Sequence, residues 1–169
     1  MKQALRVLVM LCAALLALSC DRYGRPIEEF ALEKLAKGVS TEADVRLAMG
    51  QPDTVWEEPD GSRILEYPKG PEGARTWTFT IGKDGKLVDY RNVLTEESFA
   101  RIRPGMSQDE VRRLLGRPRT VVQFKLKSEE VWDWRYLPKD STESRLFNVH
   151  FDIASGKVTR TSVSDTSLA

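Results

Sequence analysis

Hydrophobic and polar positions follow different patterns in different parts of this chain. An uninterrupted apolar run of 12 residues, Val7 to Leu18, comes first. From Thr41 onward, short stretches with apolar side chains at i, i+3 and i+4 precede stretches in which every second residue is apolar. The first spacing predicts helices with one apolar face, and the second predicts strands with one buried face. We therefore expect short helices followed by antiparallel strands.

The clearest helix signal is GMSQDEVRRLLGRP, residues 105–118. Ser107 and Glu110 have the spacing of a capping box at the start of a helix. An apolar stripe follows, and Gly116 is expected to end the helix in the left-handed conformation, with Pro118 blocking its continuation. Because the glycine follows the helix and no lysine comes after it, the motif is a helix stop and not a phosphate-binding loop.

The same pattern occurs twice. Residues 41–55 placed over residues 107–121 give a fixed offset of 66 and six identical pairs out of fifteen. The correspondence continues more loosely, and EYPKGPEGA from Glu66 aligns with RYLPKDSTE from Arg135. We interpret this as a tandem duplication with units at 20–93 and 94–169.

After each helix the apolar period changes to two. In TWTFTI, residues 76–81, the apolar side chains share one face and the threonines the other, as in an antiparallel sheet with one wet face. Residues 130–136 and 146–153 are predicted strands of the second copy. The expected fold class is α+β, with two tandem α-α-β-β-β(-β) units, each of two short helices packed on an antiparallel sheet. A lone unit of about 65–70 residues is marginally stable, so the units are expected to pack together.

The first residues predict export. Lys2 and Arg6 precede the apolar run, which is too short for a membrane span and has the form of a signal-peptide core. A small residue then precedes Cys20, and charge begins at Asp21. This resembles a bacterial lipoprotein signal, in which residues 1–19 are removed and Cys20 carries lipid such as palmitate. The alternative is an ordinary secretory signal cut nearby, with the cysteine incidental.

Charge and composition exclude several function classes. The formal net charge is +1, and without Lys2 and Arg6 the chain has 24 basic and 25 acidic side chains, so a basic nucleic-acid-binding face is not indicated. His150 is the one histidine, and if the segment with Cys12 is removed and Cys20 carries lipid, no free thiol is left to complete a metal site. A serine–histidine–acid triad would need His150 as its base, and no nucleophile-elbow sequence lies nearby. We therefore expect no catalytic residue, no metal and no cofactor other than the covalent lipid.

The aromatic residues leave two interpretations open. Trp132 and Trp134 share one face of a predicted strand, with Arg135 and Tyr136 alongside. They form either the core of the sheet or a binding surface, since tryptophan, tyrosine and arginine dominate interface hot spots.

Three motifs of the second copy resemble a known family. ARIRPGMSQDEVRRLLGRPRTV, VWDWRYLP and VHFDIASGKV, within Phe99 to Val158, are similar in order and spacing to the outer-membrane assembly lipoproteins called BamE, SmpA or OmlA. The resemblance implies a small lipid-anchored domain that faces the periplasm and has no catalytic role. It also implies an accessory role in the complex that folds β-barrels into the outer membrane, through contacts with partner lipoproteins and anionic phospholipid.

Residues at the family's contact surface can be carried over to this chain. They are Val111, Arg113, Arg117, Trp132, Trp134, Arg135 and Tyr136. The tandem arrangement is also similar to that of the secreted β-lactamase inhibitor protein, in which paired units form one concave sheet that grips an enzyme. A periplasmic inhibitor or binding module is therefore the second hypothesis. The expected location is the outer membrane rather than the inner one, although Asp21 resembles an inner-membrane retention signal of enteric bacteria.

Overall fold

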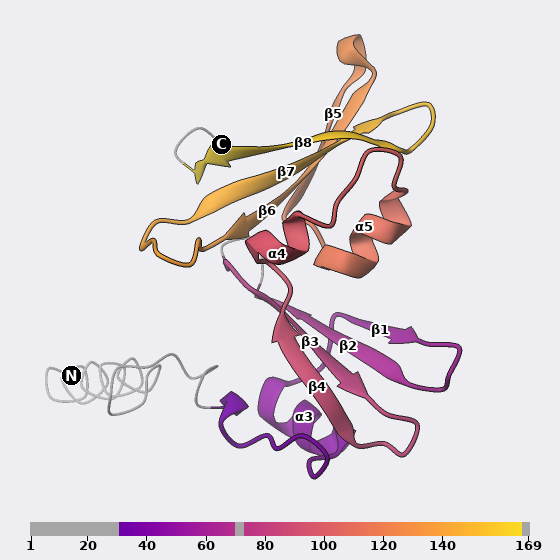
Figure 1. Ribbon diagram of the computed structural model, residues 1–169, viewed down its shortest axis with the longest axis vertical. Coiled ribbons are helices and arrows are strands. Elements are labelled where there is room, and N and C mark those ends of the chain that lie inside the picture. Colours follow the sequence, from indigo (N-terminus) through magenta and orange to yellow (C-terminus); the bar gives the residue numbers. More distant parts are fainter. Residues whose placement is uncertain (1–30, 70–72, 167–169) are drawn as a thin grey trace, which may run out of the picture.

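The computed structural model describes residues 31–69 and 73–166, which form two units of similar construction (Figure 1). The predicted signal peptide and Cys20 lie outside these residues. The first unit contains helix α3 (Glu42–Met49) and strands β1 (Thr54–Glu57), β2 (Arg63–Pro68), β3 (Thr76–Ile81) and β4 (Leu87–Asn92). The second contains helices α4 (Glu96–Phe99) and α5 (Gln108–Leu115), strands β5 (Thr120–Phe124), β6 (Glu129–Tyr136), β7 (Arg145–Asp152) and β8 (Val158–Asp165), and a 3-10 turn η1 (Lys125–Lys127).

The strands form two separate four-stranded sheets, each with its strands in sequence order and all neighbours antiparallel. The α+β class and the two-unit organisation predicted from the sequence are confirmed. Asp-Gly turns connect strands of the first sheet, with positive φ at Gly61 and Gly85, the conformation that such hairpins require. The two units do not form one continuous sheet.

Both longer helices begin with the predicted capping box. The Ser107 side chain accepts a hydrogen bond from the backbone N–H of Glu110, whose carboxylate accepts in return from the backbone N–H of Ser107. Thr41 and Asp44 do the same at the start of α3. Hydrogen bonds from the Ser107 and Thr41 backbones and hydroxyls hold the pKa values of Glu110 and Asp44 below their ordinary values. Each box satisfies two backbone donors that a helix start leaves unpaired.

Each unit has its own core on one face of its sheet. In the first unit, Val45 of α3 packs against Leu65 and Phe79 of the sheet. In the second, Val111 and Leu115 of α5 pack against Trp134. Each sheet therefore has an inner face that its own helices cover and an outer face that they do not.

Matching hydrogen bonds define how the two copies correspond. The Tyr67 hydroxyl donates to the Gly50 carbonyl, and the Trp134 Nε1–H donates to the Gly116 carbonyl, both at 3.1 Å. On the same two strands, the carbonyl of the preceding residue also accepts a matching bond: that of Glu66 at 2.8 Å from the backbone N–H of Asp53, and that of Asp133 at 2.8 Å from the backbone N–H of Arg119.

The structural equivalent of Glu66 is therefore Asp133, and the alignment of Glu66 with Arg135 is wrong. The alignment paired Tyr67 with Tyr136 by chance, because the structural equivalent of Tyr67 is Trp134. The alignment inserted the extra residues of the second copy before this strand, whereas most of them lie in the connection between β6 and β7.

Candidate functional site: the joint between the two units

Helices α4 and α5 lie between the two sheets (Figure 1). One side of α5 packs on its own sheet, and its C-terminal end contacts the outer face of the first sheet. We call this contact the joint. The second unit contributes a basic helix face, Arg112, Arg113, Gly116 and Arg117, and the first unit contributes an acidic sheet face, Asp53, Glu58 and Glu66.

Glu66 lies at the centre of the joint, and its side chain is 1% exposed. Arg112 Nη1 donates to both carboxylate oxygens of Glu66, at 2.7 and 2.6 Å. The backbone N–H of Arg117 donates to Oε1 at 2.8 Å, and the indole N–H of Trp56 donates to Oε2 at 3.2 Å. The carboxylate thus receives bonds from its own unit and from two residues of the other unit.

A carboxylate without compensation would be very unfavourable in such a position. Removing a charge from water costs several kcal/mol even after relaxation, and only close pairing with further hydrogen bonds offsets this. Arg112 supplies the opposite charge and is itself largely buried, with 18% of its side chain exposed. Separating the two units would leave both charges without these partners, so the pair favours one relative placement of the units.

Two further arginines pair with the acidic sheet face around this buried ion pair, and Arg112 Nη2 itself also lies 3.7 Å from Asp53. Arg113 Nη1 lies 2.8 Å from Glu58, and Arg117 Nη1 lies 2.9 Å from Asp53. The guanidinium of Arg113 also lies over the ring of Trp56, 4.8 Å from its centroid. Both arginines are about half exposed or more, and exposed pairs each contribute roughly 0–1 kcal/mol. The outer pairs therefore orient the contact more than they stabilise it.

Gly116 has two roles at the joint. Its φ is 76° as expected for a helix stop, but its ψ is −168°, so it is not in the predicted left-handed helical conformation. It lies in an extended region of positive φ that only glycine adopts readily. A Cβ atom added there would lie 2.8 Å from Thr76 Cγ2 and 3.1 Å from Glu66 Oε1. The missing side chain therefore also allows α5 to approach the first sheet.

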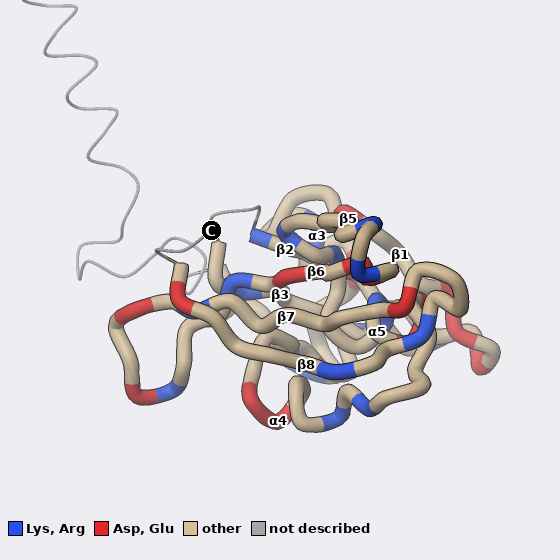
Figure 2. The backbone as a smooth tube through the Cα atoms, turned by 90° about the horizontal axis from the view of Figure 1, so that it is seen from above, with Lys and Arg blue, Asp and Glu red and all other residues tan. Residues whose placement is uncertain are grey.

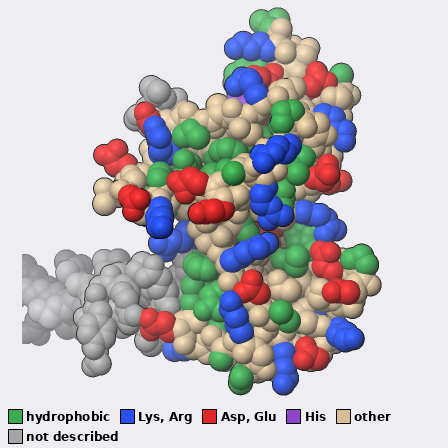
Figure 3. Space-filling view, viewed as in Figure 1, with side chains coloured by type: hydrophobic (Ala, Val, Ile, Leu, Met, Phe, Trp, Pro, Cys, Tyr) green, Lys and Arg blue, Asp and Glu red, His purple; other side chains and the backbone are tan. Residues whose placement is uncertain are grey.

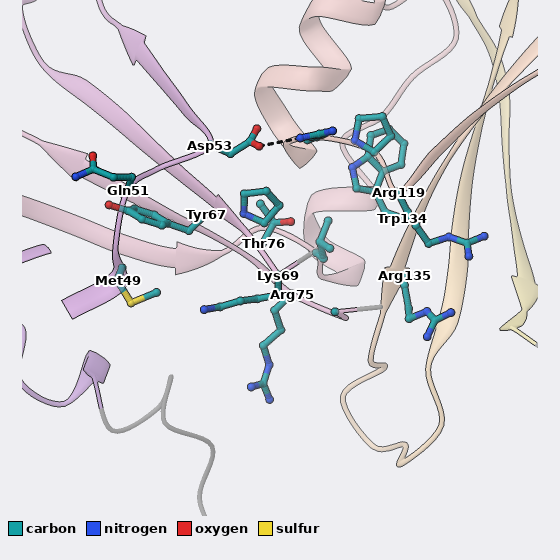
Figure 4. Close-up of a pocket in the computed structure, with 15 residues that line it drawn as sticks. Met49, Gln51, Asp53, Tyr67, Lys69, Arg75, Thr76, Arg119, Trp134 and Arg135 are labelled. Carbon is teal, nitrogen blue, oxygen red and sulfur yellow. Dashed lines mark hydrogen bonds and ion pairs between the residues drawn. The ribbon is translucent and has the colours of Figure 1, made fainter. Parts of the chain in front are cut away.

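A cleft of about 490 Å³ opens beside the joint (Figure 4). Tyr67 and Thr76 of the first unit and Trp134 of the second line it. Five basic residues and one acidic residue also line it: Lys69, Arg75, Arg117, Arg119, Arg135 and Asp53. Figure 3 shows basic side chains gathered along the waist between the two lobes, whereas Figure 2 shows both signs of charge interspersed over the molecule as a whole. The cleft is thus a local positive region on a nearly neutral protein.

The seven carried-over contact residues fall into three groups. Val111, Trp134 and Tyr136 are buried in the second core, and Trp132 packs against it. This placement gives the tryptophans the core role that the sequence had left open. Arg113 and Arg117 hold the joint, and Arg117, Trp134 and Arg135 come together in the cleft.

The acidic half of the joint was not identified from the sequence. Asp53, Glu58 and Glu66 resemble ordinary polar residues of turns and a strand. One signal was present, since Glu66 interrupts the apolar sequence of RILEYP and lies on the opposite face from Leu65 and Tyr67. A charged residue that is buried on the outer face of a strand requires a partner from elsewhere in the fold.

His150 belongs to a polar network on the outer face of the second sheet. Its Nδ1 lies 3.0 Å from Glu129 and its Nε2 lies 2.9 Å from the Ser162 hydroxyl, the spacing of a serine–histidine–acid arrangement. Arg160 Nη1 lies 3.1 Å from the same Nε2. Burial, with the nearby positive charge of Arg160, lowers the pKa of His150. Because the guanidinium competes with the serine for the imidazole lone pair, this geometry favours a structural link between β6, β7 and β8.

Among the residues that the structure describes, no group of three or more His, Cys, Asp or Glu side chains could hold a metal ion. Within 31–69 and 73–166, no helix is both long enough and apolar enough to cross a membrane.

Comparison with known proteins gives a family match that covers most of the second copy. Residues 91–161 match the BamE domain. The full description of this family model is outer membrane protein assembly factor BamE domain. The matched residues contain α4, α5, most of the second sheet and the basic half of the joint, in agreement with the resemblance noted over Phe99 to Val158. The BamE match includes only the last two residues of β4 from the first sheet, and no curated protein sequence matches the chain.

Solved structures give distant similarities over most of the chain. A protein of Streptococcus mutans assigned as a beta-lactamase inhibitor protein is 13% identical, with 82% of this chain and 96% of that chain covered, at a TM-score of 0.34. A DUF4309 family protein of Bacillus subtilis is 15% identical, with 83% and 93% covered, at a TM-score of 0.30.

Proposed function

We propose that this protein is a non-catalytic lipoprotein of the cell envelope that assists the assembly of outer-membrane β-barrel proteins, or envelope integrity, through protein contacts. The observation that carries the proposal is the BamE domain match over residues 91–161. The proposal extends an assembly role from that domain to the whole chain.

The proposed chain organisation follows from the sequence signals. Residues 1–19 are a signal peptide, 20–93 the first BamE-like unit and 94–169 the second. Lipid on Cys20 anchors the protein with both units facing the periplasm. An outer-membrane location fits the assembly role, and Asp21 is the residue that would direct the protein to the inner membrane instead.

The proposed contact surface is the positive cleft beside the joint. Arg117 has 64% of its side chain exposed at the cleft, and Arg135 is half-buried there. An acidic surface of another envelope lipoprotein, or of the β-barrel assembly machinery, complements this charge. Like-charged partners are rejected, so charge at such a rim adds specificity and raises the association rate.

The test is crosslinked pull-down from membranes, combined with separation of inner and outer membranes. We expect β-barrel assembly components to co-purify with the protein in the outer-membrane fraction. Arg117→Glu should reduce this recovery, whereas Arg101→Glu, at an exposed residue after α4, should leave it unchanged. If the wild-type protein recovers no assembly component and its deletion leaves the outer membrane intact, the proposed function is wrong. Recovery of a soluble periplasmic enzyme instead would favour the inhibitor hypothesis.

A further inference from the structure

The joint is an asymmetric contact between two similar units. A helix face of the second unit packs on the outer sheet face of the first. Because the units are structural copies, the first unit has an equivalent helix face and the second has an equivalent outer sheet face. Neither of these two equivalent faces takes part in the joint. The chain therefore carries the two halves of a second joint at opposite ends.

The helix face of the first unit keeps the backbone of its counterpart but only one of its three arginines, Arg46 in the place of Arg112. Gly50 has φ 83° and ψ −158°, close to the values of Gly116, and a Cβ atom added there would meet nothing within 4 Å. Leu47 stands in the place of Arg113, and Gln51 in the place of Arg117. Leu47 is 88% exposed on α3. The face is thus open and presents an apolar side chain.

The outer sheet face of the second unit has changed in the same manner. Phe124 stands in the place of Glu58, and Val122 in the place of Trp56. They are 45% and 44% exposed. Arg119 stands in the place of Asp53 and pairs with Asp133, the equivalent of Glu66. This face therefore presents apolar side chains beside an arginine.

The two open faces complement each other position by position. The ion pair between Arg113 and Glu58 would become an apolar contact between Leu47 and Phe124. The other outer pair, Arg117 with Asp53, would become a neutral amide facing a guanidinium, Gln51 with Arg119. At the centre, Arg46 is the equivalent of Arg112 and Asp133 that of Glu66, and each already has an ion-pair partner in its own unit, Glu42 and Arg119. At the position of the Arg113–Glu58 pair both sides are apolar instead of charged, as expected of surfaces that meet.

We propose that a second copy of this chain docks on the first, with Leu47 of its α3 against Phe124 and Val122 of the second sheet. The contact uses the β5–β6 side of that sheet, since on the β7 side Leu146 and His150 are already buried. The interface is head-to-tail, so each bound copy presents a new open face. Repetition of such a contact builds an open assembly unless the rotation happens to close a ring.

The test compares the masses of two complementary variants by sedimentation. Leu47→Glu blocks the helix end of a copy, and Phe124→Glu blocks the sheet end. Both residues are exposed, so neither change should unfold the protein. Leu126→Glu is the matched control, because Leu126 is fully exposed on η1 and lies outside the proposed contact. Full-length protein, purified as cells produce it, is measured in density-matched detergent.

We expect wild-type protein and the Leu126→Glu control to assemble with rising concentration. Each blocked variant alone should associate at least about 10-fold more weakly, because a charge replaces the apolar contact. An equal mixture of the two blocked variants should give a dimer and nothing larger, since one variant keeps the helix end and the other keeps the sheet end. A symmetric contact would not give this result.

Three outcomes would overturn the proposal. They are a wild-type protein that stays monomeric up to about 1 mM, a mixture that fails to dimerise, and a control that loses assembly as the blocked variants do. A second measurement tests the same contact through a gain of association instead of a loss. Leu47→Arg combined with Phe124→Glu rebuilds between copies the pair that Arg113 and Glu58 form within one, and should restore the association that Phe124→Glu alone removes. This assay contains no component of the β-barrel assembly machinery, so a negative result would overturn the proposed self-association and leave the proposed function unaffected.

Discussion

Replacing Arg112 with methionine should loosen the joint and destabilise the protein. The change keeps most of the apolar length of the side chain but removes the charge that faces Glu66. In the variant, the Glu66 carboxylate would retain two neutral donors, the backbone N–H of Arg117 and the indole N–H of Trp56. It would remain almost wholly buried without an opposite charge, unless the units separate to let water in.

The structure sets the size of this effect. Breaking a buried ion pair by removing one partner typically costs 3–5 kcal/mol, and the two remaining donors place this case near the lower end, at about 3 kcal/mol. For a chain of this size that corresponds to a fall in Tm of roughly 6–12 °C. The equivalent change in the first unit, Arg46→Met, removes an i,i+4 pair with Glu42 that is 31% and 15% exposed. It should cost only about 0.5 kcal/mol, which makes it the matched control.

The assay is urea unfolding followed by tryptophan fluorescence, because each unit contains two tryptophans. Wild-type protein should unfold in one transition, and Arg112→Met in a broader or divided one as the two units lose their coupling. The double variant Arg112→Met with Glu66→Leu removes both charges and should recover more than 1 kcal/mol relative to the sum of the single changes. If the single changes are additive within about 0.5 kcal/mol, the two residues are not coupled and the joint is not held as described.

Three further predictions follow from single sites. Gly116→Ala should destabilise the protein by about 1–3 kcal/mol more than Gly50→Ala in thermal melts, since both glycines have positive φ but only Gly116 touches the other unit; equal costs would contradict a packing role. Burial and Arg160 lower the pKa of His150 in the folded state, so the unfolded state binds more protons and stability should fall as the pH drops below about 6.5. His150→Gln should remove that part of the pH dependence of urea midpoints. Cys20→Ser should release the protein from membranes in cell fractionation, and a variant that still sediments with them would refute lipid anchoring at that residue.

Local signals in the sequence were enough to predict each unit. The capping boxes at Thr41 and Ser107 depend on residues three positions apart, so the sequence displays them directly. The alternation of TWTFTI placed Phe79 and Ile81 in the core for the same reason. Duplication strengthened these predictions, because a weak pattern seen twice at one offset is unlikely to arise by chance.

The joint depends on contacts that sequence periodicity does not contain. Glu66 and Arg112 are 46 residues apart, and neither has a partner of fixed local spacing. Alignment of the two copies also does not reveal the contacts of the joint, since it looks for residues that the copies share. The outer pairs of the joint are built instead from residues in which the copies differ, Asp53 against Arg119 and Glu58 against Phe124. Comparison of the differences between copies would have located these outer pairs.

This asymmetry also bears on how the BamE-like unit can act in this chain. Its basic helix face is not available as it would be on a single unit, because the first unit covers Arg112 and pairs with Arg113 and Arg117. A partner that needs all three arginines would have to displace the acidic sheet face and expose the buried Glu66. That cost is avoided if the partner instead uses the cleft, where Arg117 remains largely exposed. We therefore expect substitutions at Arg112 to act through stability and the placement of the units, and those at the exposed rim to act on binding.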